Sequence, residues 1–313
     1  MWAYFIGRLA IAVPTLFIVT IIVFSLQHLL PGDPALVMLG EDRSPEAIAQ
    51  INREYNFDQP VPVQYALWLG KAVRGDFGHS LRTRKPVAEL IVEKLPVTVQ
   101  LALMSMAFAL LIGIPTGVVS AVRKGGFWDY FANVLGMSGL SVPTFWMGIM
   151  MILLFSVRLG WLPASGYISP FENLGQNLAA MVMPAFVLGA ALAAVMMRHT
   201  RGAMLSVLRS DYVRTARAKG ITERRVILRH ALRNALMPIV TLGALQLGQL
   251  LSGAVLTEQV FTIPGFGKLI VDAVFNRDYV VVQGVVLITA TAYIALNLMA
   301  DMAYFLVNPR LRG

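Results

Sequence analysis

The sequence predicts an all-α membrane protein with six transmembrane helices, and three observations support this fold class. The chain has 313 residues, of which 57% are hydrophobic and only 14% are charged, whereas about 25% of the residues in a soluble domain are charged. Six long stretches contain no Asp, Glu, Lys or Arg. Each stretch exceeds the roughly 20 residues that a helix needs to cross the hydrocarbon and far exceeds the about 9–11 residues of a membrane β-strand.

The charge-free stretches have 22 to 28 residues, and no other such stretch exceeds 13 residues. Any minimum length between 14 and 22 residues therefore gives the same count of six spans. The first stretch is longer than the apolar region of a signal peptide, about 7–15 residues, and is therefore interpreted as a helix. Pro and Gly residues inside the spans are candidates for bends, with close packing of helices as the alternative role, at Gly113, Pro115, Gly117, Pro143, Pro184 and Pro238. The six stretches are Leu9–Gly32, Leu95–Val122, Tyr130–Val157, Asn173–Met197, Asn234–Thr257 and Tyr279–Ala300.

The distribution of Lys and Arg predicts that both termini lie in the cytoplasm. Residues Arg198–Arg233 contain ten basic residues in 36, whereas Asp33–Lys94 contain eight in 62, mixed with nine carboxylates. Cytoplasmic loops of membrane proteins are enriched in Lys and Arg. The first segment is therefore placed inside and the second outside.

The outer segment after the first span is expected to form short helices on the outer rim. Ser44-Pro45-Glu46 is a typical helix start, with a capping Ser, a Pro in the first turn and an acid behind it, and it predicts a helix to about Tyr55. Val63–Val73 and Pro86–Glu93 predict two more. The chain is accordingly divided into residues 1–94 (first transmembrane helix and extracytoplasmic segment), 95–308 (five-helix core) and 309–313 (cytoplasmic tail).

Between the fourth and fifth spans, the cytoplasmic loop 198–235 predicts a helix–turn–helix hairpin. Ser210 or Asp211 caps the first helix, Gly220 ends it in the left-handed conformation and Thr222 caps the second. One interpretation is that its arginines fix the topology and bind anionic headgroups. The other is that its compact shape docks into a protein groove, which the caps favour. DNA binding is not expected, because both ends of the loop are tethered to membrane helices.

The residues predict no catalytic or metal site. The absence of cysteine excludes a thiol nucleophile and an iron–sulfur cluster, and none of the four histidines has a second ligand three or four residues further along the chain. The uncharged spans argue against a proton-driven carrier. The chain also lacks the GxxxxGK[ST] phosphate loop. An active transporter of this kind therefore needs another subunit to hydrolyse ATP.

The fifth span carries a short polar stripe, which is the candidate substrate pathway. Gln246 and Gln249 share a helical face, and Ser252 continues it. These side chains are suited to hydrogen bonds with a peptide backbone. They are equally suited to hydrogen bonds with a partner helix, so both interpretations stay open.

Several motifs carry a resemblance over nearly the whole chain. They are Leu30–Pro34 (LPGDP), Gly75–Ser80 (GDFGHS), Asp211–Gly220 (DYVRTARAKG), His230–Pro238 (HALRNALMP), Phe261–Gly267 (FTIPGFG) and Asn308–Arg310 (NPR). With these motifs the sequence resembles permease subunits of bacterial ABC importers of the dipeptide/oligopeptide (peptide/nickel) class. Arg214 and Thr215 depart from the wider family, which has Glu and Ala at the matching positions of its docking helix.

The resemblance implies the fold of a type I ABC importer transmembrane domain in the bacterial plasma (inner) membrane. It also implies four partners: a second homologous permease, two P-loop ATPases and an extracytoplasmic solute-binding protein. The chain is then a transport subunit, not an enzyme, and binds no cofactor, while the ATPases bind ATP and Mg. The residues implied in ATPase coupling are Asp211, Tyr212, Arg214, Thr215, Ala216, Arg217, Ala218, Lys219 and Gly220.

Two alternatives remain open at this point. The chain could be a self-contained channel or secondary carrier with a basic cytoplasmic loop. If it is an importer subunit that alternates between outward-open and inward-open states, its cargo could be a di- or oligopeptide, glutathione, an opine or a nickel chelate. The outer segments Asp33–Lys94 and Glu258–Asp278 are the expected seat of the binding protein.

Overall fold

The computed structural model describes residues 2–29, 44–54 and 57–307, without the side chains of some helical residues, Ser252 among them. In this part of the chain the regular structure is helical, apart from one isolated β-bridge between His79 and Pro86. The motifs at 30–34 and 308–310 and the predicted tail 309–313 lie outside the described residues. The chain folds into two compact units, residues 1–96 with 268–294 and residues 97–267 with 295–313. The predicted boundary at 94/95 therefore lies close to a division between units, inside one long helix.

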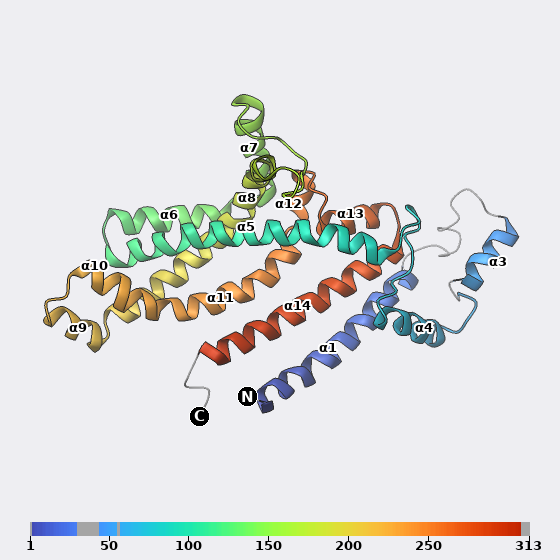
Figure 1. The fold of residues 1–313 in the computed structure, drawn as a ribbon, viewed down its shortest axis with the longest axis horizontal. Coiled ribbons are helices and arrows are strands. Elements are labelled where there is room, and N and C mark those ends of the chain that lie inside the picture. Colours follow the sequence, from blue (N-terminus) through green and yellow to red (C-terminus); the bar gives the residue numbers. More distant parts are fainter. Residues whose placement is uncertain (1, 30–43, 55–56, 308–313) are drawn as a thin grey trace. The chain divides into compact units, whose positions relative to one another are not determined.

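Unit 1 contains short helices beside two long apolar ones. Tyr65 and Trp68 of α4 pack against Phe24 of α1 with ring centroids 5.4 and 5.7 Å away, and the Tyr65 hydroxyl hydrogen-bonds to Thr20 Oγ1 at 2.7 Å. Figure 1 shows α1 running beside the first part of α14. The elements are α1 (Trp2–Leu29), α3 (Pro45–Glu54), α4 (Val61–Val73), most of α13 (Phe266–Phe275) and the first part of α14 (Tyr279–Val307).

The expected short helices are confirmed at α3 and α4, but the third is wrong. Pro86–Glu93 is not a separate helix, because helix α5 runs without a break from Val87 to Val122 and through Pro96. Val87, Leu90 and Ile91 are buried. Their burial offsets the hydrogen bond that Pro96 cannot donate.

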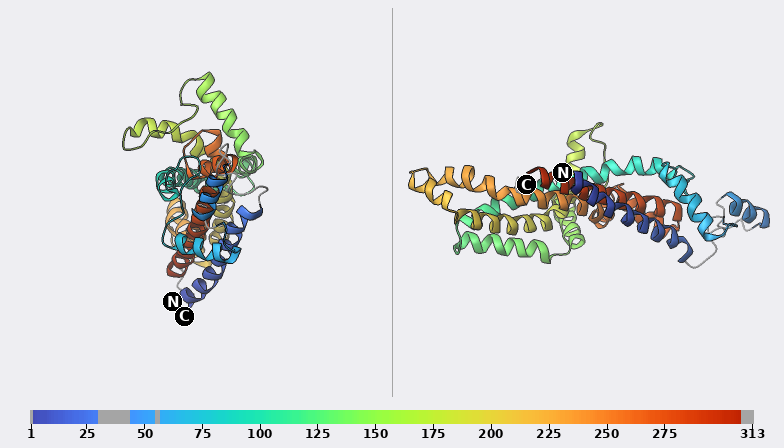
Figure 2. Two further views of the ribbon diagram at one scale, coloured as in Figure 1. Left: turned by 90° about the vertical axis from the view of Figure 1, so that its right-hand side faces the viewer. Right: turned by 90° about the horizontal axis from the view of Figure 1, so that it is seen from below.

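Unit 2 is a bundle of long helices. In Figures 1 and 2, α5, α6, α8 and α11 lie side by side, while α7 and η1 project away from them. The core contains Leu101, Met181 and Met183, each fully buried. The elements after α5 are α6 (Phe127–Ser141), α7 (Thr144–Met151), the π-helix η1 (Ile152–Arg158), α8 (Leu174–Leu208), α11 (Leu232–Gly253) and α12 (Val255–Val260).

The prediction of six spans is confirmed only in part. Within the described residues, four helices are long and apolar enough to cross a membrane, namely α1, α5, α8 and α14, and a bent pair of helices makes a fifth if it is one span. Helix α11 is not among the helices counted within the described residues. The predicted stretch Asn234–Thr257 also divides between α11 and α12.

The expected bend at Pro143 is confirmed and is large. Helices α6 and α7 meet at an angle of 100°. Val142 has an extended backbone, with φ −80° and ψ 123°, as expected for a residue before proline. Tyr130–Val157 is therefore a broken helix rather than one straight span. By contrast, Pro184 and Pro238 lie inside α8 and α11, which continue through them.

Small residues let α5 approach α8 closely. A Cβ atom on Gly113 would lie 2.6 Å from the Ala193 carbonyl oxygen, and one on Gly117 would lie 2.7 Å from that of Met197. Side chains larger than hydrogen do not fit at these distances. Of the two roles open for these glycines, bending and close packing, the structure shows close packing, the typical use of a GxxxG pattern between membrane helices.

Candidate functional site

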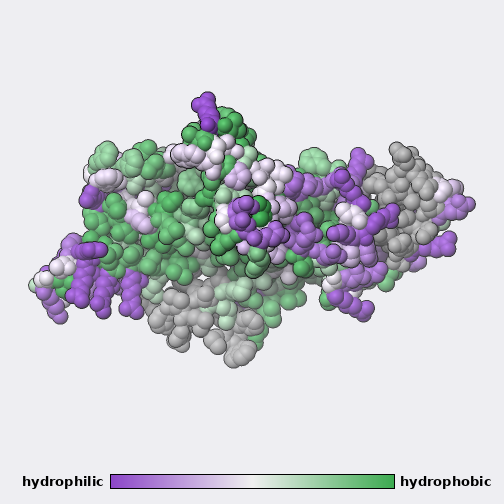
Figure 3. Space-filling view, turned by 45° about the horizontal axis from the view of Figure 1, so that its top comes forward, coloured by the Kyte–Doolittle hydropathy of each residue, from purple (hydrophilic) through white to green (hydrophobic). Residues whose placement is uncertain are grey.

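The predicted cytoplasmic hairpin is present in unit 2 and forms one end of it. It consists of α9 (Asp211–Ala218), α10 (Glu223–Arg225) and the π-helix η2 (Val226–Ala231), which leads directly into α11. In Figure 3 the hairpin is the hydrophilic cluster at the left of the view, next to the hydrophobic flank of the bundle. Ser210 and Thr222 occupy the predicted cap positions, but neither side chain makes the capping hydrogen bond. Instead, the Ser210 hydroxyl donates to the Val207 carbonyl at 2.6 Å.

The hairpin has a small apolar core of its own. Val213 and Val226 are completely buried, and Ala216 is 6% exposed. Ile221 packs against these three residues, as do Val207 and Leu208 at the end of α8. Ala216, one of the residues implied in ATPase coupling, therefore packs inside the hairpin and not on its outer surface. Val213 and Ala216 lie three residues apart on one helical face, and that face turns inward.

Gly220 forms the turn between α9 and α10 in the predicted left-handed conformation, with φ +75°. Its N–H donates to the Arg217 carbonyl at 2.9 Å, and the Ile221 N–H donates to the Ala216 carbonyl at 3.3 Å. A Cβ atom at Gly220 would meet nothing within 4 Å. The need for glycine here is therefore conformational and not steric.

Tyr212 fastens the hairpin to the transmembrane bundle. Its hydroxyl accepts a hydrogen bond from Asn234 Nδ2 at 2.8 Å and donates to the His230 carbonyl at 3.3 Å. Asn234 lies in the first turn of α11, while Tyr212 lies in the first turn of α9. The start of α9 is thus bonded to the start of α11, a long helix of the bundle.

Arg217 on α9 forms a salt bridge with Glu223 on α10, across the turn of the hairpin. Its Nη2 and Nε atoms donate to the two carboxylate oxygens of Glu223 at 2.6 and 3.1 Å. These hydrogen bonds hold the pKa of Glu223 below its ordinary value and that of Arg217 above it. Both side chains are about half exposed, 43% and 54%, so the pair is worth at most about 1 kcal/mol.

The outward face of α9 is polar and open. Arg214 lies 3.6 Å from Asp211 in a pair whose side chains are 80% and 95% exposed. The Thr215 hydroxyl donates to the Asp211 carbonyl at 2.9 Å. Ala218 and Lys219 are also exposed. Of the nine residues assigned to coupling, Ala216 alone points into the hairpin, and the others surround its solvent face.

The candidate substrate stripe on α11 is only partly described. Gln246 is half-buried and Gln249 is exposed, one turn apart on the same helix. The side chain of Ser252 lies outside the described residues. The arrangement fits a polar surface along α11 and does not identify what it binds.

A buried ionic cluster joins three helices, and no sequence pattern predicted it. The Asp129 side chain, 6% exposed, accepts Arg201 Nε and Nη2, each at 2.9 Å. It also accepts the Ser120 hydroxyl at 2.5 Å and the Gly125 N–H at 2.9 Å. These residues come from the end of α5, the start of α6 and the last third of α8. Asp129 and Arg201 are 72 residues apart, and no local pattern pairs them.

Two further polar clusters connect loops to α5 within unit 2. Gln100 Nε2 donates to Asn177 Oδ1 at 2.5 Å, and the Tyr167 hydroxyl donates to Gln100 Oε1 at 3.1 Å. The Thr98 hydroxyl donates to the fully buried Glu258 at 2.5 Å and accepts the Phe266 N–H at 2.7 Å. The second cluster fixes the turn that contains the FTIPGFG motif. Among the residues described by the structure, no group of three His, Cys, Asp or Glu is placed to hold a metal.

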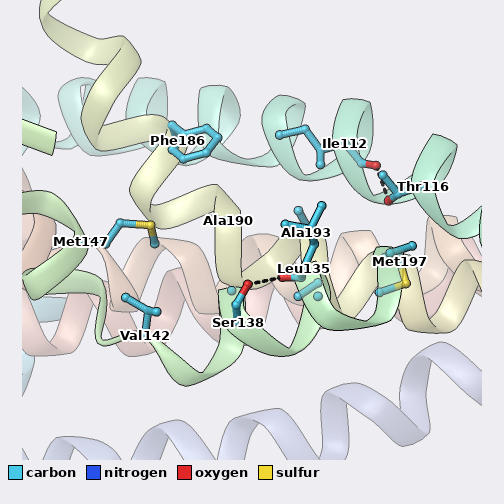
Figure 4. A pocket seen from close by; sticks show the side chains of 14 residues that line it. Ile112, Thr116, Leu135, Ser138, Val142, Met147, Phe186, Ala190, Ala193 and Met197 are labelled. Atoms are coloured by element: carbon cyan, nitrogen blue, oxygen red, sulfur yellow. Dashed lines mark hydrogen bonds between the residues drawn. The ribbon is translucent and has the colours of Figure 1, made fainter. Parts of the chain in front are cut away.

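A cavity of about 380 Å³ lies between α5, α6 and α8 and is almost entirely apolar. Figure 4 shows Phe186, Met147 and Met197 at its wall. The two hydroxyls that line it bond to their own helices, Ser138 to the Leu135 carbonyl at 2.8 Å and Thr116 to the Ile112 carbonyl at 2.6 Å. The cavity therefore offers a peptide backbone few polar partners and is not a candidate peptide site.

Comparison with known families places these features in context. A family model described as a binding-protein-dependent transport system inner membrane component matches residues 113–313. A model of the N-terminal part of such membrane components matches residues 1–102. The chain belongs to this family. It is thus a multi-pass inner membrane component of a binding-protein-dependent transport system.

Relatives of this inner membrane component align with the chain along nearly their whole length. The dipeptide transport system permease protein DppB of Escherichia coli is 42% identical over 336 residues, covering 100% of this chain and 99% of the relative. The di/tripeptide permease protein DppB of Pseudomonas aeruginosa is 42% identical, also over 100% and 99%. The glutathione permease protein GsiC of Pectobacterium atrosepticum is 43% identical over 312 residues, with the same coverage.

Solved structures support the fold of the inner membrane component. An inward-facing MetNI methionine ABC transporter superposes with a TM-score of 0.58 over 70% of this chain and 96% of that chain, at 20% identity. The expected fold of an ABC importer permease is therefore confirmed. At this identity the comparison concerns the fold and not the substrate.

Proposed function

We propose that the chain is a permease subunit of an ATP-dependent importer of di- or oligopeptides. The observation that carries this proposal is the identity of 42% to dipeptide permeases along the full length of the chain. Glutathione is the second candidate cargo, because a glutathione permease is 43% identical over the same extent. Glutathione is itself a tripeptide, so the two candidates share backbone amide and carboxylate groups.

In the proposed assembly the permease pairs with a second homologous permease to form the pathway. Two ATPases bind ATP and Mg in the cytoplasm, and a solute-binding protein delivers the cargo from outside. The chain crosses the membrane six times with both termini in the cytoplasm. Helix α11 and the broken α6–α7 segment supply the two spans beyond the four long apolar helices.

The hairpin is the proposed docking element for one ATPase. Its buried core of Val213, Ala216 and Val226 allows it to move as a unit, and the Tyr212 bond to Asn234 joins it to α11. Helix α8 enters it from the other side. Movement of the ATPase would therefore displace α8 and α11 together, which is the kind of two-state element that coupling requires.

Uptake by the reconstituted transporter tests the proposal. The permease is purified with the second permease, the ATPases and the binding protein of the same transport system, and the complex is placed in proteoliposomes. Import of labelled dipeptide that requires both ATP and binding protein is expected, with glutathione as the competitor. Import by the chain alone, driven by an ion gradient, would instead establish the self-contained carrier and contradict the proposal.

A further inference from the structure

In unit 1, the loop before α5 and the turn before α14 form one ordered surface. Asp278 is 4% exposed, and its carboxylate accepts the Ser80 hydroxyl at 2.5 Å and the Leu81 N–H at 3.2 Å. It also accepts the Val281 N–H at 3.4 Å, in the first turn of α14. One buried carboxylate therefore fastens the loop to the start of the helix.

Three arginines project from this surface, and we name Arg82, Arg84 and Arg277 the arginine ridge. The backbone N–H of Arg82 lies 3.5 Å from the Asp278 carboxylate, and Arg277 is its chain neighbour. All three are exposed. Within the described residues, none of them makes a side-chain hydrogen bond or ion pair. The fold therefore brings the backbones of three arginines close to one anchor, and no described side chain pairs with their guanidinium groups.

The acidic side chains of the same region do not neutralise the ridge. Asp76 accepts the Gly78 N–H at 2.9 Å. Glu89 lies 3.9 Å from Lys85, and Asp272 lies 3.2 Å from Lys268. Each acid is thus engaged with a neighbour other than the three arginines.

The backbone of the ridge is unusual for residues that carry a side chain. Arg84 has φ 59° and Arg277 has φ 54°, in the left-handed region that favours glycine. The backbone conformation at Arg84 and Arg277 therefore disfavours arginine relative to glycine. The three side chains are exposed, so packing within the chain does not explain them either. A partner outside the chain is the remaining use for their guanidinium groups.

We infer that the arginine ridge binds an acidic patch on the solute-binding protein, an inference that rests on the proposed function. The guanidinium fork matches carboxylates bidentately. Phe275, 83% exposed and two residues before Arg277, adds an apolar contact, and aromatic residues with Arg are typical of protein interface hot spots. The family description itself requires a binding protein, and the proposed topology places the ridge on the outer side.

The test removes the guanidinium groups by substitutions that also suit the left-handed backbone conformation at Arg84 and Arg277. Arg84→Gly and Arg277→Gly relax the left-handed positions, so a purely structural role predicts unchanged or higher stability. They are combined with Arg82→Gln in the complete transporter, reconstituted in phosphatidylcholine nanodiscs. Binding of the solute-binding protein of the same transport system is measured at about 50 and about 200 mM salt, because screening weakens exposed ion pairs.

The triple variant should bind the solute-binding protein at least about tenfold more weakly than the wild type, since each central interface Arg is worth on the order of tenfold. The salt dependence of binding should also fall. Arg158→Gln, which changes an exposed arginine of η1 outside the ridge, should leave binding unchanged. Membrane abundance should match the wild type in all variants, and the thermal unfolding temperature should be equal to that of the wild type or higher.

The possible contrary results are distinct. Equal binding by the triple variant and the wild type at both salt concentrations would overturn the ridge as the docking site and leave the proposed function intact. A loss that appears only with anionic lipid would assign the ridge to headgroups and also overturn the inference. A wild-type complex that neither binds the protein nor imports peptide would instead contradict the proposed function.

Discussion

Gly220 is the residue on which the shape of the hairpin depends most directly. Its φ of +75° is accessible to glycine and strained for a β-branched side chain, at about 1–3 kcal/mol. Gly220→Val should therefore leave the protein in the membrane but abolish uptake and weaken copurification of the ATPases. Uptake, membrane abundance and copurification are measured on the same variant.

Gly220→Asn is the matched control for this turn. Asparagine enters the left-handed region more easily than other residues with a side chain, and a Cβ atom here meets nothing within 4 Å. This variant should keep most of the uptake. Normal uptake by Gly220→Val would contradict the coupling role and leave the hairpin as a topology signal.

Replacing one partner of the Asp129–Arg201 pair should lower the free energy of unfolding. Asp129→Asn keeps the shape of the side chain but removes the charge that Arg201 meets at 2.9 Å. Removing one partner of a buried pair costs about 3–5 kcal/mol. Thermal unfolding of the purified variant should show this loss. In a double-mutant cycle with Arg201→Gln, strictly additive losses would contradict a direct interaction.

Prediction from sequence succeeded at residues whose backbone conformation restricts the residue type. It failed where the answer depended on which side of a helix faces the core. Gly220 was predictable because few residues other than glycine fit its conformation. The inward position of Ala216 was missed, although Val213 three residues earlier indicated an apolar face. Asp129 and Arg201 could not be paired, because the contact depends on how α6 and α8 pack.

At the scale of helices, the crossing of α5 and α8 depends on Gly113 and Gly117. Gly117→Leu would force a side chain into a site where a Cβ atom would lie 2.7 Å from the Met197 carbonyl. Overpacking of this kind costs about 1–3 kcal/mol or more. The melting temperature of the purified protein should fall, and uptake should fall with it.

Gly202 on α8 provides the control for this packing prediction. A Cβ atom at Gly202 would meet nothing within 4 Å, and replacing a helix glycine by a residue with a side chain gains about 0.5–1 kcal/mol. Gly202→Leu should therefore be neutral or stabilising. Equal destabilisation by the two variants would indicate that glycine packing at the α5–α8 crossing is not specific.

The helices were largely predictable because a backbone in hydrocarbon must satisfy its own hydrogen bonds, so charge-free stretches become helices. The position of the break at Pro143 was predictable for the same local reason. The 100° angle was not, because it depends on the packing of α7 in unit 2. The continuity of α5 through Pro96 was missed, because the charge-free stretch begins only at Leu95, whereas the helix already begins at Val87.

At the scale of the whole molecule, the orientation in the membrane can be tested, because the segment 198–233 lies either on the cytoplasmic side or on the outer side. The chain contains no cysteine, so cysteines introduced at Glu172 and Ser210 report without background. An impermeant thiol reagent added to intact cells should label position 172 only, because the basic segment 198–233 is proposed to be cytoplasmic. Labelling at 210 from outside would reverse the orientation and exclude the importer assignment.

The π-helix η2, between the hairpin and α11, sets the direction in which the hairpin points. A π-turn contains one residue more than an α-turn, so the segments on its two sides are out of helical phase. Deleting one residue between Val226 and Ala231 would restore α geometry and rotate the hairpin by about 100° around the α11 axis. Every helix would persist, yet the polar face of α9 would point elsewhere. The direction of the polar face of α9 therefore depends on the number of residues in η2.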